Sequence, residues 1–194
     1  MAIDSMPTLA AFYEAGKTVV SLGASTNASC RQEIREVVGR LADELDRALS
    51  LADSYLVGVQ FSKDDNEMAR YLANVDQNLM KSFLEHHICA GLYHLADEFK
   101  QVFNPKRFSI SISNHQEIPN LITLLKNGER AVLDDLDELA TDLRDLGTKL
   151  RTSKDSVKSE VRQEITNSVE YHRQALTKHR RRIKTLRRKI TDTL

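Results

Sequence analysis

Apolar residues recur every three or four positions over residues 29–60, which places one apolar stripe along one face of a helix. The stripe comprises Ile34, Val37, Val38, Leu41, Leu45, Leu49, Ala52, Leu56 and Val59. A shorter stripe predicts a helix over 7–22. A third helix is predicted over 63–103, with Ser62 as its N-cap residue ahead of two acids. Its second half is apolar on most sides, which indicates the buried centre of a bundle.

Two interleaved series with a period of seven residues follow Pro119. They are Leu125, Val132, Leu139 and Leu146, and Ile122, Leu136, Leu143 and Leu150, with Glu129 as the exception in the second series. This spacing predicts a seam of a and d positions on one long helix. Its opposite face is acidic and is interpreted as solvated: Asp134, Asp135, Asp137, Glu138, Asp142 and Asp145. Residues 108–113 alternate with period two, as either an extended connector packed on the bundle or an edge that pairs with another chain.

The heptad pattern slips over residues 147–156, where we expect a bend or a break, and a second seam then begins. Its members alternate by four and three residues, as in a coiled coil: Ile165, Val169, His172, Leu176, His179, Ile183, Leu186 and Ile190. We interpret this seam as a homo-oligomer interface, because it lies beyond the bundle and has fewer partners within the chain. Burial and neighbouring cations should lower the pKa of both histidines.

Composition agrees with a helical fold. The 194 residues include only 7 Gly and 3 Pro, whereas 41% are hydrophobic and 29% are charged. The predicted class is all-α: an antiparallel helical bundle over residues 1–150, followed by a basic amphipathic, coiled-coil-like helix over 151–194. A bundle with a coiled extension also occurs in membrane-permeabilising cell-death domains, an analogy of architecture without shared motifs.

Charge is distributed unevenly along a chain whose formal total is zero. Residues 171–194 hold nine Lys or Arg and one acid, a formal charge of +8. We therefore predict a polyanion-binding or partner-binding site made of Lys178, Arg180, Arg181, Arg182, Lys184, Arg187, Arg188 and Lys189. The alternative is an ordinary solvated face. Candidate ligands are an acidic protein, an anionic membrane surface, or a nucleic-acid backbone bound without sequence specificity.

Candidate catalytic and metal chemistry is sparse. Residues 11–18 fit a loose phosphate-loop pattern, yet no strand precedes them and their aromatic residues suit a helix core. His87, His94 and Glu98 share a helix face and are weaker candidates for a metal site, but a di-metal bundle would need a second Glu-x-x-His copy. No catalytic triad or paired carboxylate can be assigned. We expect no enzyme activity, no cofactor and no small-molecule substrate.

Localisation is predicted from the two cysteines and the hydropathy pattern. Cys30 and Cys89 are too few for a disulfide scaffold, and we see neither a signal peptide nor a long apolar run. These features predict a cytoplasmic protein that is peripheral to a membrane at most. The favoured function is a non-enzymatic helical interaction module, which self-associates or docks an acidic partner through its basic helix. The alternatives are a membrane-associating bundle and nonspecific nucleic-acid binding. We also expect the acidic face 134–145 to act as an internal latch for the basic helix.

Overall fold

The computed structural model of the protein describes residues 28–80 and 137–193, which are helical apart from short turns and contain no strand. The elements are α2 (Ala28–Gln60), α3 (Asp65–Ala73), a π-helical turn η2 (Asp76–Met80), a helix over 137–152, and α7 (Asp155–Thr193). The predicted all-α class is confirmed. Helix α2 agrees with the predicted helix 29–60. The predicted helix 7–22 and the extended segment 108–113 lie outside the described ranges.

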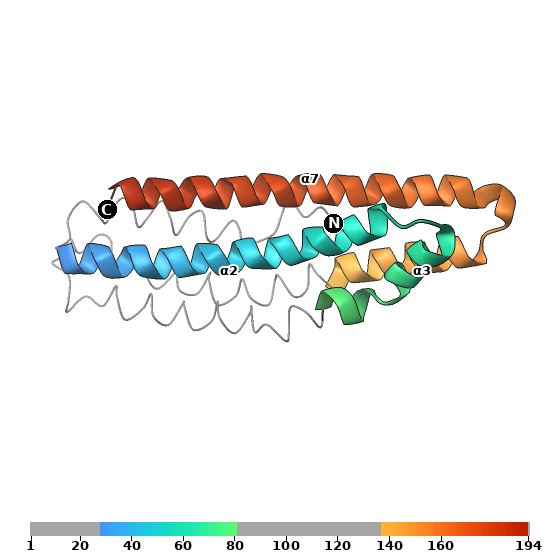
Figure 1. Cartoon of the computed structure of the whole chain (residues 1–194), viewed down its shortest axis with the longest axis horizontal. Coiled ribbons are helices and arrows are strands. Elements are labelled where there is room, and N and C mark those ends of the chain that lie inside the picture. The colour runs from blue at the N-terminus through green and yellow to red at the C-terminus, as the bar shows by residue number, and fades with distance from the viewer. Residues whose placement is uncertain (1–27, 81–136, 194) are drawn as a thin grey trace.

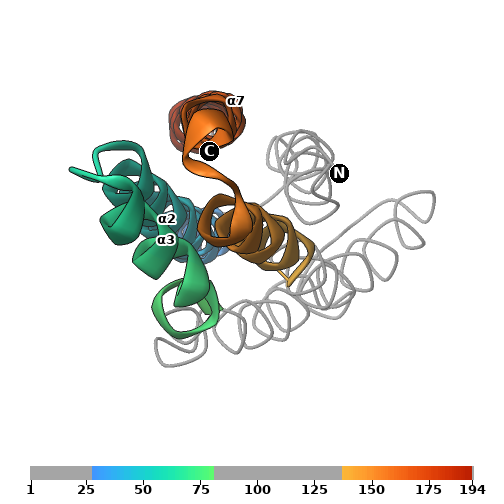
Figure 2. The same cartoon turned by 90° about the vertical axis from the view of Figure 1, so that its right-hand side faces the viewer.

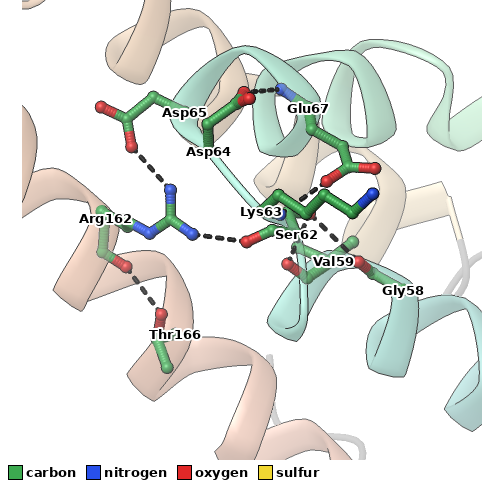
Figure 3. A network of polar contacts seen from close by, with 9 residues as sticks. All are labelled: Gly58, Val59, Ser62, Lys63, Asp64, Asp65, Glu67, Arg162 and Thr166. Carbon is green, nitrogen blue, oxygen red and sulfur yellow. Dashed lines mark hydrogen bonds and ion pairs between the residues drawn. The ribbon is translucent and has the colours of Figure 1, made fainter.

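The turn between α2 and α3 corrects the predicted N-cap (Figure 3). Ser62 is buried and ends α2, because its hydroxyl donates to carbonyl oxygens of the last turn, including that of Val59 at 2.9 Å. The N-cap residue of α3 is Asp64, whose carboxylate accepts from the backbone N–H of Glu67 at 2.8 Å. The Glu67 carboxylate in turn accepts from the N–H of Lys63. Two acids therefore satisfy amides at the start of the helix, where the dipole also favours negative charge.

The predicted helix 63–103 is interrupted within its described part. Helix α3 ends at Ala73, and the Asn74 side chain donates to the carbonyl oxygen of Arg70 at 3.0 Å. An asparagine amide that competes for a helix carbonyl favours a break of this kind. The backbone then continues through the π-helical turn η2. The apolar face is nevertheless continuous, because Met68, Leu72, Val75 and Leu79 are all buried.

Residues 137–152 pack closely on α3. Leu139, Leu143 and Leu150, three members of the predicted first seam, are buried here, as is Ala140. A Cβ atom on Gly147 would lie 2.6 Å from the Cβ of Leu72, so a side chain at this position would push the two helices apart. An ion pair of 2.6 Å between Arg144 and Asp76 joins the same helix to η2.

A two-residue turn at Ser153 and Lys154 joins helix 137–152 to α7, as the slip in the heptad pattern predicted. The hydroxyl and the backbone N–H of Ser153 both donate to the carbonyl oxygen of Lys149, which ends the first helix. The backbone carbonyl of Lys154 then accepts the first amides of α7. Lys149 also pairs with Glu164 across the turn, so the two helices form an antiparallel hairpin.

Helix α7 does not project from the bundle as an extension. Figures 1 and 2 show α7 beside α2, with the chain direction reversed. Ion pairs confirm this arrangement, from Arg173 with Asp53 to Arg187 with Asp43. The expected boundary near residue 150 is therefore a turn between packed helices.

Candidate functional site

The inward face of α7 is its seam. Within the described side chains, every predicted seam member is buried: Ile165, Val169, His172, Leu176, His179 and Ile183. The facing side of α2 is also buried, with Leu45, Leu49, Ala52, Leu56 and Val59 at 6% exposure or less. These side chains are thus covered within a single chain. The seam therefore has partners in α2, contrary to the expectation that it has fewer partners within the chain, and the homo-oligomer interface stays a prediction.

His172 lies in this seam at 8% exposure, beside the ring of Tyr171, whose centroid is 5.4 Å away. Burial lowers the pKa of His172 below its ordinary value of 6.5, while the carboxylate of Asp142 opposes that shift. The His172 Nδ1 atom is buried and has no hydrogen-bond partner among the residues that the structure describes. The predicted direction of its pKa is confirmed, with burial as the main cause.

Three arginines of α7 lie next to the seam with a period of seven residues: Arg173, Arg180 and Arg187. Arg173 and Arg180 each follow a seam histidine directly. Their partners Asp53 and Asp46 also lie seven residues apart, and each follows a buried seam residue of α2. Because the two helices run in opposite directions, equal spacing keeps both pairs in register. We call these α2–α7 contacts the arginine ladder.

The central pair of the ladder is Arg180 with Asp46. Arg180 Nε donates to one carboxylate oxygen of Asp46 at 2.8 Å, and Nη2 donates to the other at 3.3 Å. Both side chains are 27% exposed, so water screens the pair only in part. The Arg180 guanidinium holds the pKa of Asp46 below its ordinary value, and Asp46 raises the pKa of Arg180. Lys184 lies farther off, 3.8 Å from Asp46.

The pair nearer the α2–α3 turn belongs to a larger network. Arg173 donates to Asp53 at 2.9 Å and also to the side-chain oxygen of Gln60. Gln60 in turn donates to Glu170 at 3.0 Å. Beyond this network, Arg162 pairs with Asp65 at 2.8 Å and donates to the Ser62 carbonyl oxygen at 2.6 Å (Figure 3).

Arg181 and Arg188 lie on the side of α7 opposite its seam, which we call the outward face. Lys184 is exposed as well, but it lies 3.8 Å from Asp46 of α2. Arg181, Arg182, Lys184, Arg188 and Lys189 are exposed, as is Lys178. Arg181 and Arg188 lie seven residues apart, as the ladder arginines do, but neither pairs with a carboxylate among the described residues. A groove of about 470 Å³ runs along this face, lined by Glu170, Arg173, Gln174, Thr177, Lys178, Arg181 and Arg182.

The acids that pair with Arg180 and Arg187 are not the expected ones. The predicted latch was the acidic face 134–145, yet Arg180 and Arg187 pair with Asp46 and Asp43 of α2. Asp137, Glu138, Asp142 and Asp145 are exposed, and positions 134 and 135 lie outside the described ranges, so the latch itself stays a prediction. Sequence reasoning missed Asp43, Asp46 and Asp53. Sorting acids by their position next to a seam, rather than by local density, would have found Asp46 and Asp53.

Other predicted sites are absent from these ranges or fall beyond them. His87, His94 and Glu98 lie outside the described residues, and residues 28–80 and 137–193 contain no cluster of three metal-ligating side chains. The helices in the same ranges include none whose length and apolar content would suit a bilayer crossing.

Comparison with known proteins gives no match to this chain among family models, curated proteins or solved structures.

Proposed function

We propose that the protein is a non-enzymatic helical interaction module, and that the outward face of α7 docks an acidic partner. The observation that supports this proposal is the division of the cations on α7. Arg187, Arg180 and Arg173 pair with Asp43, Asp46 and Asp53 of α2, whereas Arg181 and Arg188 are exposed on the opposite side. Exposed arginines seven residues apart repeat the spacing with which α7 already binds the carboxylates of α2.

An acidic protein is preferred over a membrane surface because of what is buried. An amphipathic helix that lies on lipid inserts its apolar face into the boundary between headgroups and acyl chains. The apolar face of α7 is covered by its own chain, and Leu176 and Ile183 are each 1% exposed. While α7 stays packed on α2, a membrane surface could therefore contact only its cationic side chains and not its apolar face.

Nucleic acid is also a weaker candidate than an acidic protein. Single strands are held by aromatic side chains that stack on successive bases. Among the described residues of α7, only Tyr171 is an exposed aromatic, at 49%. Self-association at the seam would require displacement of α2, so docking on the outward face is the simpler interaction. We propose that the α2–α7 pair is an antiparallel coiled coil that presents this face.

The test compares two double variants with the same change of charge. Arg181→Gln with Arg188→Gln removes outward cations, whereas Arg180→Gln with Arg187→Gln removes inward ones. The outward variant should weaken binding of poly-glutamate by roughly threefold to tenfold, because each lost contact is worth about 0–1 kcal/mol. The melting temperature of the outward variant should equal that of the parent protein. The melting temperature of the inward variant should be lower.

Parallel titrations against anionic liposomes and duplex DNA, at low and high salt, separate the other candidates. Liposome binding that survives high salt would favour apolar insertion. DNA binding stronger than poly-glutamate binding, with a steep salt dependence, would favour a nucleic-acid backbone. Poly-glutamate binding that is unaffected by loss of Arg181 and Arg188 would contradict the proposed docking face.

A further inference from the structure

The outward face of α7 changes in charge along its length. Five of its residues lie farthest from the seam and recur every seven positions: Glu160, Asn167, Gln174, Arg181 and Arg188. All five are exposed, and we call them the outward stripe. The stripe begins with an acid, continues through two amides and ends with two arginines. It therefore carries opposite charges at its two ends.

The outward stripe lies at an edge of the described bundle. Figure 2 views α7 almost end-on, with α2 and the helix 137–152 on one side of it and no described helix on the other. Two apolar side chains are exposed beside the stripe, Val157 at 41% and Tyr171 at 49%. Each lies three residues before a stripe member, and so on the same side of the helix. An exposed tyrosine among polar side chains suits a protein interface, where tyrosine is enriched.

The outward stripe is complementary to its own reverse. Glu160 and Arg188 each lie fourteen residues from Gln174, so an antiparallel copy of α7 centred on Gln174 places Glu160 opposite Arg188. A two-fold axis through that centre makes this contact twice. A parallel copy would instead place acid beside acid and arginine beside arginine. Charge complementarity therefore favours the antiparallel arrangement.

The two ends of the stripe are available for this contact. Glu160 and Arg188 are exposed, and neither forms an ion pair among the residues that the structure describes. Antiparallel helices of this chain already pair charges in the same way, since Arg180 of α7 binds Asp46 of α2. The stripe spans about 42 Å of helix, which separates the two contacts and lets them fix the register.

The interior of the stripe is compatible with the same register. The antiparallel arrangement places Asn167 opposite Arg181, which is also exposed and forms no ion pair within the described ranges. The Asn167 amide oxygen accepts a hydrogen bond from Gln163 at 2.9 Å, and a carbonyl oxygen can accept a second one from a guanidinium group. Like charges therefore do not meet anywhere along the stripe.

We propose that the acidic partner of the outward face is a second copy of this chain, whose α7 lies antiparallel to the first with Gln174 at the centre. This inference rests on the proposed docking function of the face and names its partner. The seam stays packed on α2, so the contact needs no unfolding. Because the stripe is polar and solvated, the dimer should be weak and should dissociate as the salt concentration rises.

Charge reversal at the two ends of the stripe tests the arrangement. Sedimentation velocity at low salt, over a range of protein concentrations, measures the dimer affinity. Glu160→Arg places arginine opposite Arg188, and Arg188→Glu places glutamate opposite Glu160, in both cases twice per dimer. Each reversal should weaken the affinity by roughly tenfold or more, because repulsion replaces attraction.

Two combinations and one control make this test specific. Both reversals in one chain, or an equimolar mixture of the two single variants, should restore the dimer because every acid again faces an arginine. Asp145→Arg makes the same change of charge as Glu160→Arg at an exposed position of the helix 137–152, and it should leave the affinity unchanged. Melting temperatures equal to that of the parent protein show that each variant is folded.

Asn167→Glu tests the register by a gain of affinity. The new carboxylate lies opposite Arg181 of the second copy, so the dimer should become roughly threefold tighter or more at low salt. Asn167→Lys should weaken it, because a lysine there lies opposite an arginine. Equal affinities for these two variants would overturn the register centred on Gln174.

The remaining outcomes separate this inference from the docking function on which it rests. A parent protein that stays monomeric at every concentration in low salt would overturn the second copy as the partner, as would an affinity that neither charge reversal changes. If Arg181→Gln with Arg188→Gln still weakens poly-glutamate binding in that case, the face docks a different acidic protein. A mixture of the two reversed variants that stays monomeric would overturn the antiparallel contact.

Discussion

Two faces of one helix differ in what their arginines do. On the inward side of α7, Arg173 and Arg180 bind Asp53 and Asp46 and are only 25% and 27% exposed. On the outward side, Arg181 and Arg188 are exposed and pair with no described carboxylate. Arg180 and Arg181 are neighbours of the same type. The comparison shows that position relative to the seam, and not local charge density, decides whether a cation holds the fold together.

The largest expected effect comes from the buried apolar side chains on the inward face of α7. Leu176→Ala removes a side chain that is 1% exposed, and it should lower the free energy of unfolding by about 2–5 kcal/mol. Thr177→Ala, one residue later on the exposed side, should change it by less than about 0.5 kcal/mol. Denaturant unfolding measures both variants. Similar losses would show that α7 is not packed as described.

The charged part of the contrast should give a smaller effect. Arg180→Gln should lower the free energy of unfolding by about 1 kcal/mol, because Asp46 then keeps its desolvation cost with only the more distant Lys184 as a charged partner. Arg181→Gln should stay within about 0.5 kcal/mol of the parent. Chemical denaturation of both variants at low and high salt measures these changes. High salt should reduce the difference in the free energy of unfolding between the two variants.

Acid should act on the inward face in two steps. The pKa of His172 is lowered in the folded state, so the unfolded chain binds more protons once the pH falls below about 6.5. Stability should therefore decrease from that pH down to the folded pKa and then level off. The pKa of Asp46 is also lowered, so its contribution is present above about 3.8 and is lost only at lower pH.

Melting temperatures between neutral pH and pH 5 follow the first of these steps. His172→Leu should reduce the loss of stability over this range, because the leucine cannot bind a proton. His172→Leu that responds to acid as the parent does would place the titrating group elsewhere.

Periodicity was sufficient to predict much of this fold. It located the helix 29–60, the break near residue 153 and the buried phase of the seam through Ile183, because each depends on short-range spacing along one helix. Ser62 misled the prediction of the third helix, since serine can end a helix as well as begin one. Asn74 gave no warning of a break because the apolar face continues past it.

The partners of the basic helix could not be predicted in the same way. The acids at 134–145 are denser in sequence, whereas Asp46 and Asp53 are separated by seven residues and are easily overlooked. Their role depends on which helix faces α7 and in which direction it runs, and neither follows from one-dimensional spacing. The register of α7 against α2 also determines that Arg180 pairs with Asp46 and that Arg181 is exposed.

The central claim is that Arg180, and not its neighbour, is committed to Asp46. A double-mutant cycle measures this directly, using Asp46→Asn with Arg180→Gln and, as the matched control, Asp46→Asn with Arg181→Gln. The first cycle should give a coupling energy of about 1 kcal/mol in the free energy of unfolding, and the second should give none within error. A zero coupling for Arg180, or an equal one for Arg181, would contradict the account of the two faces.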